Sequence, residues 1–234
     1  MNKNIFQRKD FFLLFFILIV AFVLRLYKIN IPLADLHSWR QVDTAAVARN
    51  FVNDGFDLLH PRYDDLSNVQ SGIENPKGYR MVEFPIYNAI FAYCYKVFPF
   101  LTLEVWGRLI SVISSLFVIL IIYYLTLKEI NRVSAFFASL IYAVFPFFVF
   151  FSRVILPEST ALAFSFGAIF VFYVSVENKN KLLNLFLKYF SSLLFTIAIL
   201  IKPLIIFYLL PIVYLFFIEY KFKSIKKLLF IYIF

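Results

Sequence analysis

Residues 35–44 read DLHSWRQVDT, a polar stretch that follows closely on the apolar run Phe11–Ile29. The stretch holds two carboxylates, a histidine and an arginine: Asp35, His37, Arg40 and Asp43. Charged side chains are scarce in the rest of the chain, most of which is apolar. Ionisable groups gathered at the end of a membrane-length run predict a functional site at the surface of a membrane.

Composition places the chain in a membrane. Of its 234 residues, 62% are hydrophobic and 16% are charged, whereas soluble domains have about 45–50% apolar and about 25% charged residues. Several apolar runs approach the roughly 20 residues that cross a bilayer as a helix. The predicted fold class is therefore all-α, a polytopic transmembrane helical bundle. The net charge of +9 fits Lys and Arg in cytoplasmic loops and not a nucleic-acid partner. The single Cys94 excludes an intrachain disulfide and a cysteine-based zinc site.

We expect a single module over the whole chain. Residues 1–29 form a cytoplasmic tail and first span, residues 30–104 an outer loop with amphipathic surface helices, and residues 105–234 further spans. The first run exceeds the roughly 7–15 residues of a signal-peptide core, so it is predicted to be retained. Because the sequence ends inside an apolar run that starts at Leu228, we expect a module truncated at its C-terminus.

One surface helix is expected over residues 38–53. Ser38 and Gln41 have the Ser-x-x-Gln spacing of a capping box, which predicts a helix start, and Gly55 predicts its end. Apolar side chains share one face at three- and four-residue spacing: Val42, Ala45, Ala48 and Val52. Such a helix would lie along the membrane surface rather than cross it.

The apolar segment Glu83–Phe100 could either span the membrane or lie on its surface. Clearer spans follow it, at Val105–Leu127, Val133–Phe151, Ser159–Val176, Leu182–Ile201 and Leu204–Ile218. If the segment does not span, the basic clusters between these spans all fall on the cytoplasmic side, as the positive-inside rule requires. We therefore predict a surface helix, which puts Glu158 and Lys202 on the same side as Asp43. A spanning segment would instead split the site across the membrane.

The residues predicted on this outer side combine acids, a base and cations. Arg and Lys can hold phosphate, and a carboxylate can act as a general base or bind a divalent cation. The candidates for substrate binding are His37, Arg40, Arg153 and Lys202. Structural roles are open for several of these residues. Asp43 can serve the first turn of a helix, Arg40 can pair with Asp43, and Lys202 can snorkel to the interface. A carboxylate placed against a bilayer, such as Glu158, favours function.

Several motifs together resemble the GT-C glycosyltransferases. In chain order they are residues 37–51 (HSWRQVDTAAVARNF), 83–87 (EFPIY), 108–110 (RLI), 152–158 (SRVILPE) and 201–203 (IKP). The resemblance is to the N-terminal half of these enzymes, in a bacterial branch similar to protein O-mannosyltransferases and the lipid A aminoarabinose transferase. It implies a multi-pass enzyme of the bacterial plasma membrane. Such an enzyme moves a sugar, with inversion, from a polyprenyl-phosphate donor to a hydroxyl of a lipid, glycan or protein acceptor on the outer face.

The resemblance also implies roles for individual residues. It places a catalytic carboxylate in the first outer loop, a second one at Glu158, and a contact with the donor phosphate at Lys202. Glu83, which comes shortly before a proline, matches a glutamate that helps to hold a divalent cation in some relatives. A divalent cation at Glu83 is therefore a further expectation.

The sequence departs from the family pattern at the start of the first-loop helix. Many relatives carry Asp-Glu there, whereas this chain has Arg40 and Gln41. The catalytic carboxylate is then Asp43, one turn later, or Asp35, just before the helix. Asp43 is preferred because a helix would fix its position better.

Two other function classes compete with this interpretation. A transporter or lipid flippase would place ionisable groups or broken helices near the bilayer midplane. Here the mid-span positions are almost all apolar and the charges gather at one interface. A non-catalytic membrane scaffold would not need acidic residues converging on one face.

Overall fold

The computed structural model describes residues 6–33, 35–68 and 72–220. This part of the chain is built from helices, and Arg62 and Tyr79 form an isolated antiparallel bridge in the loop between two of them. The lysine cluster that follows Tyr220 and the final apolar run lie outside the described residues, and so does the predicted truncation.

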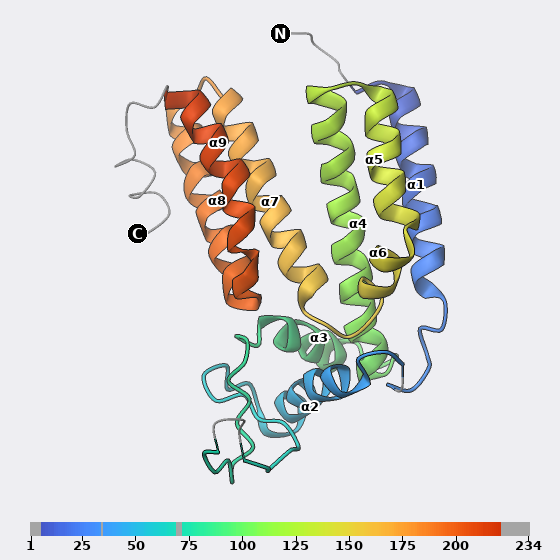
Figure 1. Ribbon diagram of the computed structural model, residues 1–234, viewed down its shortest axis with the longest axis vertical. Coiled ribbons are helices and arrows are strands. Elements are labelled where there is room, and N and C mark those ends of the chain that lie inside the picture. The colour runs from blue at the N-terminus through green and yellow to red at the C-terminus, as the bar shows by residue number, and fades with distance from the viewer. Residues whose placement is uncertain (1–5, 34, 69–71, 221–234) are drawn as a thin grey trace.

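The long helices stand side by side in two groups (Figure 1). One group holds α1 (Arg8–Leu26), α4 (Leu103–Glu129) and α5 (Arg132–Val144), and the other holds α7 (Glu158–Glu177), α8 (Lys181–Ile201) and α9 (Leu209–Tyr220). Packing between α4 and α7 joins the groups. The bundle has two buried apolar cores, one around Ile119, to which α7 also contributes, and one around Phe172.

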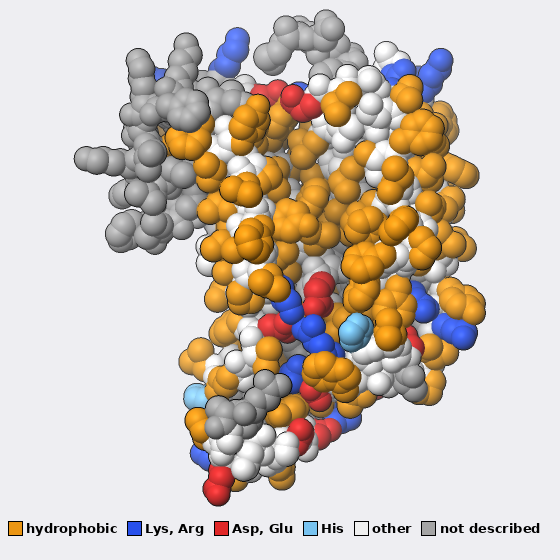
Figure 2. Space-filling model, viewed as in Figure 1, with side chains coloured by type: hydrophobic (Ala, Val, Ile, Leu, Met, Phe, Trp, Pro, Cys, Tyr) orange, Lys and Arg blue, Asp and Glu red, His pale blue; other side chains and the backbone are white. Residues whose placement is uncertain are grey.

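Three of these helices, α4, α7 and α8, are long and apolar enough to cross a membrane. Large apolar side chains on the outside of the bundle are exposed, including Phe117, Phe137 and Leu193, and Figure 2 shows hydrophobic side chains over most of this face. Side chains of this kind are what a bundle presents to lipid. The prediction of an all-α membrane bundle is confirmed.

Two of the predicted spans are broken near a proline. The span expected over Val133–Phe151 divides into α5 and a short helix, α6 (Pro146–Phe151). The span expected over Leu204–Ile218 begins as a 3₁₀ helix, η1 (Pro203–Tyr208), and continues as α9. Proline has no backbone N–H to donate and its ring crowds the preceding turn, so an α-helix rarely runs through it unchanged.

The break after α5 is capped by Arg25 of α1. The Arg25 side chain is fully buried, and Nη1 and Nη2 donate to the carbonyls of Ala143 (2.8 Å) and Tyr142 (3.2 Å). A cation is favoured at the C-terminal carbonyls of a helix. Arg25 Nε also donates to Ser152 Oγ (2.6 Å). Helix α1 is thereby tied to the turn that leads into α7.

Two further helices, α2 (Ser38–Asp54) and α3 (Ile86–Val97), lie across one end of the bundle (Figure 1). They pack on each other and on α4 through an apolar cluster that includes Phe51 and Phe91. Helix α3 therefore does not run alongside the long helices (Figure 1), which agrees with the prediction of a surface helix.

The start of α2 differs from the prediction. The residue before its first turn is His37, at φ 60°, and no side chain caps the helix. The prediction of a capping box formed by Ser38 and Gln41 is wrong, because the Gln41 side chain is buried and bonds to Asp35 instead. Val42 is 45% exposed and does not belong to the buried face. That face carries Thr44, Ala45, Ala48 and Phe51. Gly55, at φ 102°, ends the helix as predicted.

Candidate active site

Four charged side chains meet where the α2–α3 layer joins the bundle. They are Arg40 in α2, Glu83 before α3, Glu158 at the start of α7 and Lys202 at the end of α8. Arg40 Nη2 lies 3.0 Å from Glu83 Oε1, and Arg40 Nη1 lies 3.3 Å from Glu158 Oε1. Lys202 Nζ pairs with Glu83 and lies 3.2 Å from Glu158 Oε1. We call these four residues the charged cluster. Figure 2 shows acidic and basic side chains gathered at this junction, below the apolar bundle.

Helix topology brings the cluster together. Helices α7 and α8 are packed neighbours joined by a short loop, so the first residue of α7 and the residue after α8 lie at one end of the bundle. The N–H of Phe84 donates to the carbonyl of Leu200 (3.1 Å), which lays Glu83 beside Lys202. Glu158 and Lys202 thus lie at the same end as α2, as predicted.

The charged cluster is balanced in charge but not in hydrogen bonding. Its two carboxylates face two cations, and Oε1 of Glu158 serves both cations. Oε2 of Glu158 is buried and has no hydrogen-bond partner among the described residues. The four side chains are 15–32% exposed, so a ligand can reach them. Because buried polar atoms are nearly always paired, the unpaired Oε2 of Glu158 leaves the charged cluster with one acceptor that no described residue uses.

Asp43 lies beside the cluster and pairs with Arg80. Nη1 of Arg80 lies 2.8 Å from Asp43 Oδ2, and both side chains are mostly buried. Burial raises the pKa of Asp43, and the positive charge of Arg80 opposes this rise. A small hollow of about 20 Å³ is lined by Arg80 and Glu83, among others, so the pair borders the charged cluster.

Arg80 is the site residue that the sequence-based prediction missed. Its backbone N–H donates to the carbonyl of Pro61 (2.8 Å) in the loop between α2 and α3, and its guanidinium stacks on Tyr63 at 5.4 Å. The sequence offers one signal, which is that Arg80 lies three positions before Glu83. Only the apolar pair Met81 and Val82 separates them. No spacing rule links it to Asp43, because the two residues are 37 positions apart.

The other predicted site residues lie outside the cluster. Asp35 Oδ1 accepts a hydrogen bond from Gln41 (2.6 Å). His37 is exposed and its ring lies 6.0 Å from that of Phe151. Arg153 donates to the carbonyl of Tyr27 (2.6 Å). The structure therefore groups Arg40, Glu83, Glu158 and Lys202 and leaves Asp35, His37 and Arg153 with other partners.

The arrangement around Glu83 does not fit a resident divalent cation. The Glu83 carboxylate accepts from both Arg40 and Lys202, which already neutralise it. Among the described residues, no three His, Cys, Asp or Glu side chains gather in a way that could hold a metal. We therefore derive no step through a cation, and the cation at Glu83 stays a prediction.

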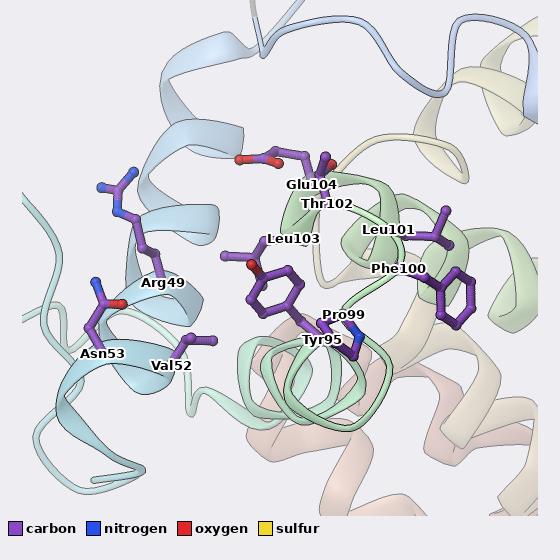
Figure 3. Close-up of a pocket in the computed structure, with 10 residues that line it drawn as sticks. All are labelled: Arg49, Val52, Asn53, Tyr95, Pro99, Phe100, Leu101, Thr102, Leu103 and Glu104. Atoms are coloured by element: carbon purple, nitrogen blue, oxygen red, sulfur yellow. The ribbon is translucent and has the colours of Figure 1, made fainter.

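A larger hollow of about 500 Å³ lies between the second half of α2, the end of α3 and the first turn of α4. Figure 3 shows its lining: Arg49, Val52, Asn53, Tyr95, Pro99, Phe100, Leu101, Thr102, Leu103 and Glu104. None of these residues belongs to the charged cluster. The larger hollow is therefore separate from the candidate active site.

Comparison with known proteins assigns the chain to a family. Residues 83–234, well over half of the chain, match the family described as dolichyl-phosphate-mannose-protein mannosyltransferase. The matched part contains Glu83, Glu158 and Lys202, and it begins after α2, so Asp35, Arg40 and Asp43 lie outside it. No curated protein and no solved structure matches the chain.

Proposed function

We propose that this chain, a member of the dolichyl-phosphate-mannose-protein mannosyltransferase family, transfers a sugar. The donor would be a polyprenyl-phosphate sugar and the acceptor a hydroxyl group. The family makes the chain a membrane glycosyltransferase of the GT-C type. The proposal adds the donor, an acceptor that is a lipid, glycan or protein, and inversion at the anomeric carbon. It also adds a place: the outer face of the bacterial plasma membrane.

The observation that carries the proposal is that Arg40 and Lys202 pair with the same two carboxylates at the edge of an apolar bundle. A polyprenyl chain would lie against the apolar outside of the bundle, and its phosphate would then reach the two cations. Charge-assisted hydrogen bonds to phosphate are strong, and they would also stabilise the phosphate as it leaves the sugar. Incoming phosphate would compete with Glu83 and Glu158 for these donors.

Asp43 is the carboxylate best suited to act as general base. Burial raises its pKa, and a general base is most effective when its pKa lies near the working pH. Asp43 would take the proton of the acceptor hydroxyl. The acceptor oxygen would then bond to the anomeric carbon while the bond from that carbon to the phosphate oxygen breaks. The products are the glycosylated acceptor and polyprenyl phosphate.

Glu158 would orient the acceptor. Its Oε2 is buried and unpaired among the described residues. The carboxylate would turn toward the substrate to accept a hydrogen bond from a second acceptor hydroxyl. Asp35 is less suited to a catalytic role, because its carboxylate is held by the buried amide of Gln41. Arg153 and His37 would then contact lipid or the entering substrate from the rim.

The proposal is tested with the full-length protein in vesicles that contain radiolabelled polyprenyl-phosphate sugars. Label should move to a lipid, glycan or peptide acceptor, and Glu158→Gln should slow this transfer. If the wild-type protein releases no polyprenyl phosphate from any of the donors, the proposed reaction is wrong.

Orientation needs a separate experiment. Reporters fused after Leu101 and Glu158 should lie on the outer face, and a reporter after Lys128 should lie in the cytoplasm. A cytoplasmic reporter after Glu158 would rule out an outer-face site.

A further inference from the structure

A fully buried glutamine joins the two segments that carry the candidate active site. Gln41 in α2 is 0% exposed. Its Nε2 donates to Asp35 Oδ1 (2.6 Å) and to the carbonyl of Leu36 (3.1 Å), and its Oε1 accepts from the backbone N–H of Ile155 (3.2 Å). Residue 155 lies in the turn between α6 and α7, 114 positions further along the chain.

Chemistry fixes which way the Gln41 amide points. A backbone N–H can only donate, so it must meet the amide oxygen. A carboxylate and a carbonyl can only accept, so they must meet the amide nitrogen. Each polar atom of the Gln41 side chain therefore has its partner, and a fully satisfied buried polar group holds its neighbours in one arrangement.

These contacts lie next to the charged cluster on both sides. Arg40 directly precedes Gln41, and Glu158 follows Ile155 by three residues. The turn is also held from α4, where Ser111 Oγ donates to the carbonyl of Val154 (2.9 Å). The buried bond from Gln41 to Ile155 thus joins α2 to the turn close to the point where Arg40 meets Glu158.

We propose that Gln41 is a positioning residue that holds α2 against the α6–α7 turn and so keeps Arg40 within reach of Glu158. Its effect on sugar transfer rests on the proposed function, but its effect on geometry does not. Glutamine suits this place because it presents a donor and an acceptor at once.

A carboxylate at position 41 would bring three acceptors together, those of its own side chain, Asp35 and Leu36. Arg40 and Asp43 are the nearest charges along the chain. Asp35 contacts Gln41 directly, and Arg108 of α4 lies within electrostatic range of Asp35.

The test exchanges the two bonded groups. Gln41→Glu should lower the melting temperature of the full-length protein at pH 7.5 by about 5–10 °C, because a buried bond is replaced by facing acceptors. The loss should shrink as the pH falls, since the protonated introduced carboxyl can donate to Asp35 again. Asp35→Asn alone keeps an amide oxygen that accepts from Gln41, so it serves as the matched control and should change little. The double variant Asp35→Asn/Gln41→Glu re-forms the bond in reverse and should recover most of the loss at pH 7.5.

A distance measurement separates positioning from simple stability. Spin labels placed at the exposed positions Val42 and Phe147, in a Cys94→Ser background, report the separation of α2 and α6. The label-to-label distances are measured at pH 7.5, below the melting temperature of Gln41→Glu. Their distribution should be narrow in wild type and in the double variant, and broader in Gln41→Glu. An unchanged distribution in Gln41→Glu, or a double variant as unstable as Gln41→Glu alone, would overturn the inference.

A phosphate probe links the geometry to the site. Farnesyl phosphate should bind Gln41→Glu at least about 10-fold more weakly than wild type at pH 7.5, which corresponds to one charge-assisted contact, and the double variant should bind it like wild type. If wild type itself does not bind farnesyl phosphate, the proposed donor site is wrong, and the spin-label distances alone decide the role of Gln41. Equal affinity of wild type and Gln41→Glu would count against that role.

Discussion

The bundle has a carboxylate network at each end, and the two networks differ in burial and in how completely they are bonded. At the end opposite the α2–α3 layer, Asp10 is fully buried. It accepts from Nε and Nη2 of Arg132 (2.6 and 3.0 Å), from the hydroxyl of Tyr123 (3.1 Å) and from the N–H of Gln7 (2.8 Å). Both oxygens of Asp10 are satisfied by groups of the protein itself.

The charged cluster at the other end is left open. Oε2 of Glu158 has no partner among the described residues, while its Oε1 and Glu83 Oε1 share the same two cations. A closed network contributes stability by tying α1 to α4 and α5. An open network costs some stability and offers donors and acceptors to a ligand. This difference predicts that substitutions at the two ends affect different properties.

The largest effect is expected for Asp43→Asn. Loss of a general base should slow sugar transfer about 10²–10⁴-fold, with little change in melting temperature. The measurement is transfer of labelled sugar by purified protein. Asp10→Asn is the matched control at the closed end and should leave the transfer rate of folded protein unchanged. Equal transfer rates of Asp43→Asn and wild type would show that Asp43 is not the general base.

A smaller effect is expected for Lys202→Met. One charge-assisted contact to the donor phosphate is worth about 1.5–3 kcal/mol, so the KM for the donor should rise roughly 10–100-fold. Lys202→Arg keeps the charge and should retain most of the donor affinity. If Lys202→Met lowers the rate at saturating donor and leaves the KM unchanged, Lys202 acts on the chemical step and not on donor binding.

At the closed end, Asp10→Asn should lower the free energy of unfolding by about 2–3 kcal/mol, because the ion pair with Arg132 loses its negative charge. Denaturant unfolding of the purified protein measures this change. The comparison of the two ends fails if Asp10→Asn leaves stability unchanged while Lys202→Met lowers it.

The smallest effect concerns pH. Because burial raises the pKa of Asp43, transfer should fall as the pH is lowered through that raised pKa, where the base becomes protonated. Arg80→Gln removes the charge that opposes the rise, so the acid limb of the pH–rate profile should move to higher pH. The pH dependence of stability has the opposite sign to that of the transfer rate. Because the pKa of Asp43 is raised in the folded protein, Asp43 favours folding more at acid pH than at neutral pH.

Arg62→Gln is the control for this experiment. Arg62 is exposed in the same loop and lies 3.7 Å from Asp54, so its loss should leave the pH profile as in wild type. An equal displacement in both variants would indicate a general charge effect and not a specific contact with Asp43.

Pattern-based prediction succeeded where one element carries the signal. The spans at α4, α7 and α8 were predicted within a few residues, because an apolar run of membrane length needs no partner to be recognised. The position of α3 across the end of the bundle agrees with the prediction from the loop charges. Prediction failed where a neighbour decides the outcome, as at Gln41, whose amide bonds to Ile155 and Asp35 instead of capping α2.

The sequence by itself determined that this protein is a helical membrane protein, and it predicted that Glu158 and Lys202 lie at the same end as the DLHSWRQVDT stretch. Its motifs resembled those of the GT-C enzymes, and the family match agrees. Hydrophobic length and charge asymmetry are local properties of the chain, so the sequence carries them directly. Only the tertiary structure decided which of these charges meet. Lys202 and Glu83 are 119 positions apart, Arg40 and Glu83 are 43 apart, and Asp43 meets Arg80 rather than the cluster. Ion pairs form over a few ångströms, and across such separations the packing of the helices, not the spacing in the sequence, sets those distances.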